Sequence, residues 1–326
     1  MSEVIRPLRG WAVLALAALV SVAATGCLDS DVPGGEGTIT TTTTRIASVN
    51  LVDPDRDTNQ TCEETAPTDV DAPDPQRILV ADPNLLDPLC ALGLQTRVVA
   101  STTVGGSLPT FMGDAVHDLP TVGEKSRPNV AMAVASNPDI VLTTGGSPLD
   151  SAMGATPVVT INPAQEWEKR FLAVAEAVGR TGAAEQRLQS YVDGTKALGE
   201  RLGARYTQAS LVRFGADTET VEGTDGFAAQ VLTDIGVQRP PGQREPKSQE
   251  ITDKNFEIAD GDVVYVSFQG KAGQEHGTSV LKSDRWLDMG AASWNRVLLV
   301  PDDVWYSAGG LSAANVIAGN VRNTLN

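Results

Sequence analysis

The side chains best suited to hold a small molecule lie near the end of the chain. Trp305 and Tyr306 follow Pro301-Asp302-Asp303, in a loop just past an expected strand. Large aromatic side chains at such a position line ligand clefts and supply apolar contact. Packing between this loop and the closing helix is the alternative role for both residues.

Arg213 is a second candidate, because it lies at the end of an expected strand, residues 210–214. A guanidinium there can pair with ligand carboxylates or hydroxamate oxygens. An ion pair with Asp217 or Glu219 is the structural alternative. A single arginine is little positive charge for a highly anionic ligand, so a neutral or amphiphilic ligand suits these residues at least as well.

Two glycine-rich loops follow strands expected in the first half of the chain. They are Val104-Gly105-Gly106-Ser107 and Thr144-Gly145-Gly146-Ser147. A doubly wound sheet places its ligand loops at such strand ends. The loops either cradle a ligand with backbone amides or are simply flexible. We take Asp82, Thr103 and Thr144, at three strand ends, as further candidate ligand-binding residues.

Catalytic and metal-binding chemistry has little support in the sequence. The two histidines, His117 and His276, are far apart and have no metal-ligand spacing. No G-x-S-x-G, P-loop or H-E-x-x-H pattern occurs. We therefore expect a protein that is not an enzyme, with no catalytic residues, no cofactor and no metal site of its own.

The protein is acidic, with a formal net charge of −16 over 326 residues. It has no basic tract, which argues against a nucleic-acid partner. Hydrophobic residues make up 41% and charged residues 20%, as is ordinary for a soluble globular protein. The length allows two domains.

Residues 1–26 have the pattern of a lipoprotein signal peptide. Arg6 and Arg9 precede an uncharged run, residues 10–24, that is too short for an unaided membrane span. The run ends in Ala24-Thr25-Gly26-Cys27, which resembles a bacterial lipobox. Lipidation of Cys27 would hold the mature protein on the outer face of the cytoplasmic membrane through the lipid alone. Ordinary cleavage near Cys27, leaving a free thiol, is the alternative.

The other two cysteines, Cys62 and Cys90, favour a disulfide, because an even pair outside the cytoplasm is more often bonded than free. Cys90 lies in an apolar helical run, so burial as a small hydrophobic residue is the alternative. Residues 27–75 as a whole are rich in Thr, Asp and Pro. That composition predicts a flexible linker.

Alternating strands and helices predict two α/β lobes, residues 76–164 and 207–326. Such alternation gives βαβ units and a mostly parallel sheet. The expected strands are residues 77–82, 96–100, 139–143, 157–161, 210–214, 262–267 and 296–300. The expected helices are residues 85–94, 128–135, 226–235, 252–259 and 311–325.

Residues 165–206 connect the two predicted lobes. Within them, residues 181–206 carry apolar side chains at helical spacing, with Thr181 at the start and Gly203 at the end. Taken alone, a helix of this length either braces two lobes or packs inside one domain. The βαβ pattern on both sides favours a strut between lobes.

Several stretches of this sequence resemble those of a known family. Asn137-Pro138-Asp139-Ile140-Val141 is similar to a phrase that closes a helix–strand unit in its first lobe. Arg213-Phe214 with residues 226–240, and then residues 258–266, are similar to its second-lobe pattern. Residues 286–297 and 305–310 are similar to its tail. The family is the class III (cluster A) substrate-binding proteins of ABC importers, and the greatest resemblance is to actinobacterial ferric-dicitrate-type lipoproteins.

The resemblance covers residues 76–326 and implies an α/β fold of two Rossmann-like lobes, joined by one long α-helix, with a ligand cleft between them. It implies a lipoprotein, anchored on the extracytoplasmic face of the cell membrane, that captures an iron chelate for ABC-type import. The chelate would be a siderophore or ferric citrate. A haem-binding lipoprotein, or an envelope lipoprotein that acts through protein–protein binding, is the alternative.

The sequence departs from the family where members dock on the permease. The family usually presents a Glu on each lobe to Arg pairs of the transporter. Ala131 and Lys254 occupy those positions here, with Glu124 and Glu250 nearby but out of place. We therefore expect weak or absent binding to a conventional importer of this class.

Overall fold

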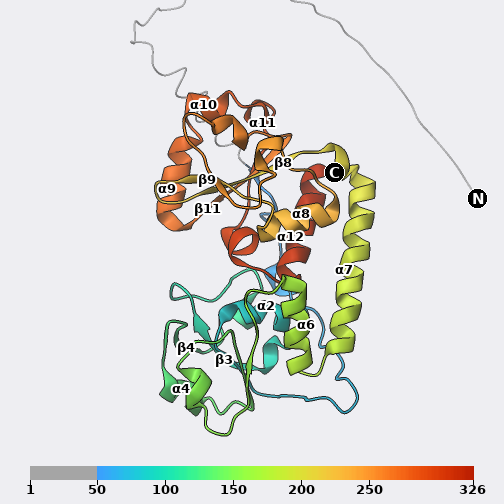
Figure 1. Ribbon diagram of the computed structural model, residues 1–326, viewed down its shortest axis with the longest axis vertical. Helices are drawn as coiled ribbons and strands as arrows, with labels where there is room; N and C mark the ends of the chain where they lie inside the picture. Colours follow the sequence, from blue (N-terminus) through green and yellow to red (C-terminus); the bar gives the residue numbers. More distant parts are fainter. Residues whose placement is uncertain (1–49) are drawn as a thin grey trace, which may run out of the picture.

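The computed structural model describes residues 50–326. The predicted signal peptide, the predicted lipidation site Cys27 and residues 27–49 of the predicted linker lie outside the described residues. The described chain forms two α/β lobes, and the long helix α7 (Thr181–Leu202) runs along both of them (Figure 1). In this part of the chain, no helix combines the length and the apolar character needed to cross a bilayer.

The N-terminal lobe is built on a six-stranded sheet with strand order β5-β4-β3-β2-β6-β7. All neighbours pair in parallel except β4 and β5. The central strands are apolar and buried, as expected for a parallel sheet covered on both faces. The strands are β2 (Ile78–Val80), β3 (Val98–Thr103), β4 (Thr121–Glu124), β5 (Arg127–Pro128), β6 (Ile140–Thr143) and β7 (Val158–Thr160).

The C-terminal lobe has a second six-stranded sheet, in the order β1-β12-β11-β8-β9-β10. The first four strands of that order are parallel, and β9 and β10 close the edge antiparallel. One of its two edge strands, β1, comes from the start of the described chain. The strands are β1 (Asn50–Leu51), β8 (Ala209–Phe214), β9 (Glu219–Val221), β10 (Gln249–Glu250), β11 (Val263–Phe268) and β12 (Val297–Leu299).

Helices cover both sheets and fill the space between them. Where a helix was predicted at residues 252–259, only a short 3-10 turn, η6 (Phe256–Ala259), forms. The α-helices besides α7 are α2 (Leu86–Ala91), α3 (Asp114–His117), α4 (Val130–Ala135), α5 (Leu149–Ala152), α6 (Trp167–Ala177), α8 (Phe227–Ile235), α9 (Gly270–Val280), α10 (Asp284–Leu287), α11 (Gly290–Ser293) and α12 (Leu311–Leu325).

The helix α7 acts as a strut, because it packs on elements of both halves of the chain, namely α6, α8 and α12. Tyr191 and Leu198 are buried on its inner face. Gly199 allows close contact with α8, since a Cβ there would collide with the carbonyl oxygen of Ile235. The helix ends at Gly203, which takes the left-handed conformation (φ 61°) that glycine adopts without strain.

Residues 50–75, which we call the strap, are not the linker that their composition predicts. The strap starts as β1 in the C-terminal sheet, where Val52 N–H donates to Leu299 O. It then crosses to the N-terminal lobe, where Thr61 Oγ1 donates to Phe111 O at 2.7 Å. Cys62 forms the predicted disulfide with Cys90 on α2. The strap is therefore a second connection between the lobes, besides α7.

A buried arginine holds the far end of the strap. Arg180 is 1% exposed and donates through Nε to Ala66 O at 2.9 Å. Its Nη2 forms an ion pair with Asp74 at 2.5 Å. Hydrogen bonds from Arg180 and Arg97 hold the pKa of the Asp74 carboxyl well below its usual value. The strap is thus fixed by a side chain that follows α6.

The lobes also meet through a buried carboxylate. Asp87 on α2 accepts the backbone N–H groups of Ser312 and Ala313, the first turn of α12, both at 2.9 Å. A Cβ at Gly310 would collide with this carboxylate, so glycine permits the approach. Burial raises the pKa of Asp87 to about 6, and the hydrogen bonds from α12 and the charge of Arg170 oppose that rise.

We predict that Asp87→Asn destabilises the fold by about 1–3 kcal/mol, because the amide nitrogen of Asn cannot accept a hydrogen bond from the second of the two buried N–H donors. The pKa of Asp87 is higher in the folded state than its ordinary value of 3.8. Its contribution to the unfolding free energy therefore grows as the pH falls from about 6 to 4, and is lost as the pH rises again through 6. Urea unfolding at pH 7.5 and 4.5 should show a larger deficit for Asp87→Asn at the lower pH.

The exposed Asp118→Asn is the matched control and should behave like the parent at both pH values. A deficit for Asp87→Asn that is the same at both pH values would contradict the assigned protonation of this carboxylate.

We predict that reduction of Cys62–Cys90 lowers the unfolding free energy by about 3 kcal/mol, because the bond restricts a loop of about 29 residues in the unfolded chain. Denaturant unfolding with and without a reductant measures the change. The Cys62→Ala/Cys90→Ala variant should not respond to the reductant. Free thiols at both positions in a non-reducing peptide map of exported protein would show the prediction wrong.

Candidate ligand-binding site

In the N-terminal lobe, polar side chains gather where β2 and β6 end. Asp82 is 1% exposed and accepts from Thr144 Oγ1 at 2.6 Å. Lys125 Nζ forms an ion pair with the same carboxylate at 2.5 Å, and the Lys125 side chain stays 39% exposed. Two of the predicted residues, Asp82 and Thr144, therefore lie together, and the exposed ammonium of Lys125 joins them.

Thr103, the third predicted residue of this lobe, has a structural partner. It is buried, and its hydroxyl donates to Glu124 Oε1 at 3.2 Å. The same Glu124 oxygen accepts the Gly106 N–H at 2.6 Å. Thr103 and Glu124 thus fix the glycine-rich loop after β3, and Thr103 does not present its own side chain at the surface.

In the C-terminal lobe, the ends of β8, β11 and β12 meet at one carboxylate. Arg213 donates through Nε and Nη2 to the two oxygens of Asp302, both at 2.7 Å. Ser267 Oγ donates to Asp302 Oδ1 at 2.7 Å. The pairing of Arg213 with Asp217 or Glu219, considered from the sequence, is wrong, because Asp302 is the partner of Arg213 and Glu219 pairs with Arg285.

Tyr306 lies against the Arg213–Asp302 pair. The Arg213 guanidinium carbon is 5.1 Å from the centre of the Tyr306 ring. The Tyr306 hydroxyl has no hydrogen-bond partner among the described residues, and burial raises its pKa. The carboxyl of Glu222 is close enough to add to that rise. Tyr306 therefore places an aromatic ring beside a guanidinium, while its hydroxyl is buried and has no partner among the described residues.

Trp305, predicted from the sequence to line a ligand cleft, is instead buried in the core of the C-terminal lobe. Its side chain is 1% exposed, and its ring centre is 4.6 Å from that of Tyr265 on β11. Its indole N–H donates to Asn320 Oδ1 on α12 at 3.2 Å. Trp305 thus packs the π-helical turn η7 (Asp303–Ser307), to which it belongs, against the sheet and the closing helix.

Arg170 on α6 links the two lobes, and sequence reasoning missed it. Its Nη2 donates to Gly309 O, between η7 and α12, at 2.7 Å. Its charge also acts on the carboxylates of Asp82 and Asp87 in the N-terminal lobe. A second contact joins the lobes directly, because Thr110 Oγ1 donates to Asp303 Oδ2 at 3.1 Å. An arginine in an amphipathic helix carries no sequence signal of such a role.

We call this set of polar residues the inter-lobe face: Asp82, Lys125, Thr144, Arg170, Arg213, Asp302 and Tyr306. Two of its three cations are matched by acids, because Lys125 pairs with Asp82 and Arg213 with Asp302. The third, Arg170, donates to the backbone carbonyl oxygen of Gly309. The face is therefore polar without being strongly charged. In the described part of the chain, no three His, Cys, Asp or Glu side chains are grouped so as to hold a metal ion. The arrangement can contact a ligand through hydrogen bonds and one aromatic ring, and it contains no nucleophile paired with a base.

Three comparisons with known proteins agree with this architecture. A family model described as periplasmic binding protein matches residues 78–304. A probable siderophore-binding lipoprotein of Bacillus subtilis is 24% identical over 268 residues, 76% of this chain and 82% of that protein. An achromobactin-binding periplasmic protein of Dickeya dadantii is 21% identical over 262 residues, covering 76% of this chain and 85% of that protein.

A similar fold occurs in a solved structure of Staphylococcus aureus SirA complexed with staphyloferrin B, with a TM-score of 0.63 and 20% identity. The match covers 78% of this chain and 94% of the solved chain. The family is one of binding proteins, in agreement with the expectation that the protein is not an enzyme. The family model spans most of the described residues, and the chain belongs to the periplasmic binding protein family.

Proposed function

We propose that the protein is an extracytoplasmic lipoprotein that captures an iron chelate at the inter-lobe face for ABC-type import. The observation that carries this proposal is that polar side chains gather at the strand ends of each lobe in a chain of the periplasmic binding protein family. Arg170 links the lobes, because it donates to Gly309 O of the C-terminal lobe and its charge acts on Asp82 of the N-terminal lobe. The relatives named above are a probable siderophore-binding lipoprotein and an achromobactin-binding periplasmic protein, and SirA was solved with staphyloferrin B bound. These names support a siderophore as the ligand.

The charge balance of the inter-lobe face favours a ligand of low net charge. Arg213 already has a bidentate partner in Asp302, so an anionic ligand must compete with that carboxylate. Tyr306 adds an aromatic ring beside that guanidinium. A neutral or amphiphilic ferric siderophore fits these groups better than ferric citrate does.

The lobes are expected to move little when the ligand binds. The strut α7, the strap and the Asp87 contact with α12 all join them. Three connections at different places resist a large rotation of one lobe against the other. Affinity should then depend on residues already in place, with little free energy lost to reorganisation.

We predict that ferric hydroxamate or catecholate siderophores, titrated into the purified mature protein, bind it and quench its tryptophan fluorescence. Arg213→Gln should weaken binding by about tenfold or more, because a charge-assisted contact and the packing against Tyr306 are lost. Asp302→Asn should improve binding of anionic ferric citrate, since it frees the guanidinium.

Arg296→Gln removes an exposed arginine away from the inter-lobe face and serves as the matched control. Haem is included in the panel, because it is the alternative ligand. If no iron chelate and no haem binds, the transport proposal fails, and binding to envelope proteins becomes the better explanation.

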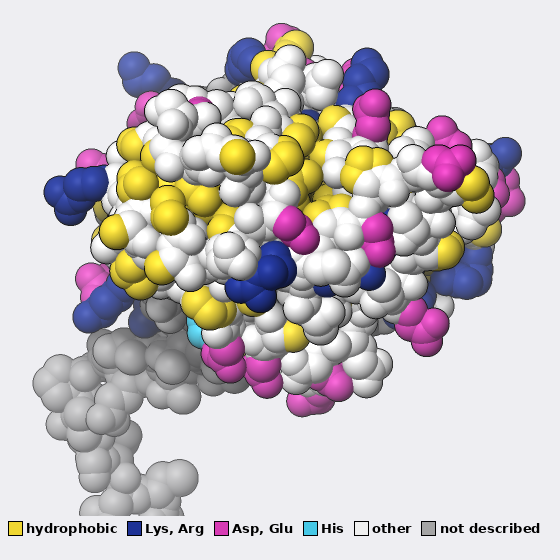
Figure 2. Space-filling view, turned by 90° about the horizontal axis from the view of Figure 1, so that it is seen from below, with side chains coloured by type: hydrophobic (Ala, Val, Ile, Leu, Met, Phe, Trp, Pro, Cys, Tyr) yellow, Lys and Arg dark blue, Asp and Glu magenta, His cyan; other side chains and the backbone are white. Residues whose placement is uncertain are grey.

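The surface expected to meet a permease lacks the usual acids. Ala131 is exposed on α4, beside Met132 and Val134, which are 51% and 50% exposed. Lys254 is exposed on the C-terminal lobe. Figure 2, which views the molecule from the end formed by the N-terminal lobe, shows hydrophobic side chains gathered on part of that end. Glu124 does not replace the missing acid, because Thr103 and Gly106 already bind its carboxylate.

We predict that Ala131→Glu with Lys254→Glu strengthens binding to a conventional permease of this class, because each change presents a carboxylate to an Arg pair. A surface-binding assay against a candidate permease measures the effect. Ala155→Glu with Lys282→Glu makes the same charge change at other exposed positions and should have little effect. Tight binding by the parent that is lost in the double glutamate variant would show that these positions do not face the permease arginines.

A further inference from the structure

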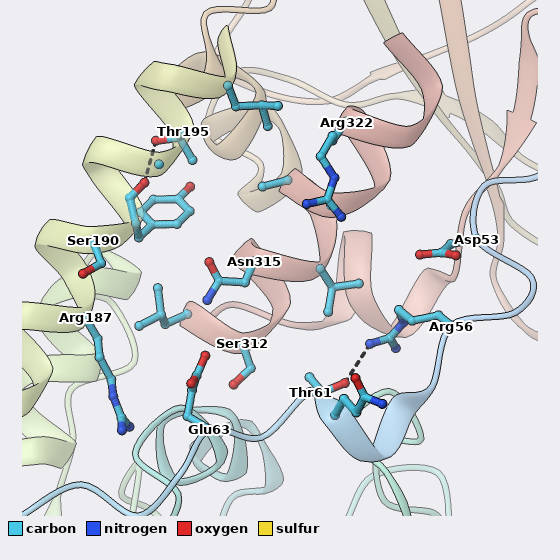
Figure 3. Close-up of a pocket in the computed structure, with 18 of the residues that line it drawn as sticks. Asp53, Arg56, Thr61, Glu63, Arg187, Ser190, Thr195, Ser312, Asn315 and Arg322 are labelled. Atoms are coloured by element: carbon cyan, nitrogen blue, oxygen red, sulfur yellow. Dashed lines mark hydrogen bonds between the residues drawn. The ribbon is translucent and has the colours of Figure 1, made fainter. Parts of the chain in front are cut away.

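A cavity of about 830 Å³ lies away from the inter-lobe face. The strap, α7 and α12 form its walls, as Figure 3 shows. None of the residues of the inter-lobe face lines it. Its volume falls within the range of about 300–1,000 Å³ that is usual for small-molecule sites.

The charge of the cavity lining is opposite in sign to that of the whole protein. Its guanidiniums are Arg56, Arg187, Arg201 and Arg322, and its carboxylates are Asp53, Asp57 and Glu63. The lining thus has one more cation than anions, in a chain whose formal charge is −16. A region of this kind attracts anions from solution, even though most of the surface repels them.

Two of these arginines already have partners. Arg56 donates to Thr61 Oγ1 at 2.7 Å and to Phe111 O at 3.1 Å. Arg187 donates to the carbonyl oxygens of Ala91 and Glu64. Both side chains hold the strap and the N-terminal lobe in place, and they add positive charge to the cavity.

Arg322 is different, because within residues 50–326 its side chain makes no hydrogen bond or ion pair, and the same is true of Arg201. Arg322 extends from α12 over the cavity in Figure 3, on the side that faces Asp53. The Asp53 carboxylate accepts from Asn323 Nδ2 at 3.4 Å and does not form an ion pair with Arg322. A guanidinium with free N–H donors is a geometric match for a carboxylate.

Apolar side chains complete the site. Leu198 on α7 and Leu311 and Val316 on α12 line the same cavity as Arg322. The Tyr191 hydroxyl is already used, because it donates to Asp234 at 2.7 Å, so its ring is the part left to contact a ligand. The lining therefore combines a free cationic donor with an apolar wall.

We propose that this cavity is a second ligand site, for an amphiphilic organic acid whose carboxylate binds Arg322 and whose apolar body packs on Leu198 and Val316. The site depends on the strap, which forms one wall, and is separate from the inter-lobe face. The proposal does not rest on the proposed function, because it uses none of the residues assigned to the iron chelate.

Octanoate and acetate are suitable probes, because they share the carboxylate and differ in the apolar body. Isothermal titration calorimetry of the disulfide-bonded mature protein should detect octanoate, with acetate bound at least about tenfold more weakly. Arg322→Gln should weaken octanoate binding by about tenfold or more, since a charge-assisted contact is lost. Arg296→Gln, the same substitution outside the cavity, should bind octanoate like the parent.

Siderophore titration of Arg322→Gln should match the parent, which separates this site from the inter-lobe face. The proposal is overturned if octanoate does not bind at millimolar concentration. It is equally overturned if Arg322→Gln leaves octanoate binding unchanged, or if both substitutions reduce it alike.

Discussion

The position of the C-terminal helix depends on one buried carboxylate from the other lobe. Asp87 on α2 accepts the N–H groups of Ser312 and Ala313, which begin α12. A helix N-terminus leaves such donors unsatisfied and carries the positive end of the helix dipole, so an acid there is stabilised despite its burial. Because η7 leads directly into α12, this contact also sets where Tyr306 lies relative to the N-terminal lobe.

The strap and the strut support the same arrangement from either side of the cavity. The strap is bound to the C-terminal sheet through β1 and to α2 through the Cys62–Cys90 disulfide. The strut α7 packs on α6 and α8, and Gly199 allows its close contact with α8. Two lobes held by separate connections keep the inter-lobe face, which we propose as the ligand site, in place before any ligand arrives. The ordering entropy of that face is then lost in folding rather than in binding.

Charged side chains of the inter-lobe face form pairs because they are partly or fully buried. Arg213 and Asp302 are half-buried, and each would be costly there without the other. The same holds for Asp82, whose buried carboxylate is matched by Lys125 and the Thr144 hydroxyl. Such pairs leave little net charge for an anionic ligand. The cavity walled by the strap, α7 and α12 differs from the inter-lobe face in this respect. The Arg322 guanidinium that lines it has no hydrogen-bond partner among the described residues.

The sequence by itself determined the central strands of both lobes, the long helices and the family. Apolar runs predicted the buried strands β2 and β6, helical spacing predicted α7, and an even cysteine pair predicted the disulfide. These features could be predicted because each depends on neighbouring residues or on a simple count. The placement of Asp82 and Thr144 at adjoining strand ends could be predicted for a related reason, since parallel strands bring their carboxyl ends to one edge.

Only the tertiary structure decided the roles of the remaining residues. Trp305 and Tyr306 are adjacent and both aromatic, yet one is core and the other meets Arg213. Arg213 pairs with a residue 89 positions away, which no local pattern shows. The strap has a linker's composition, but backbone hydrogen bonds to both lobes and one disulfide order it. These contacts depend on which distant segments folding brings together, and composition and periodicity describe only neighbours along the chain.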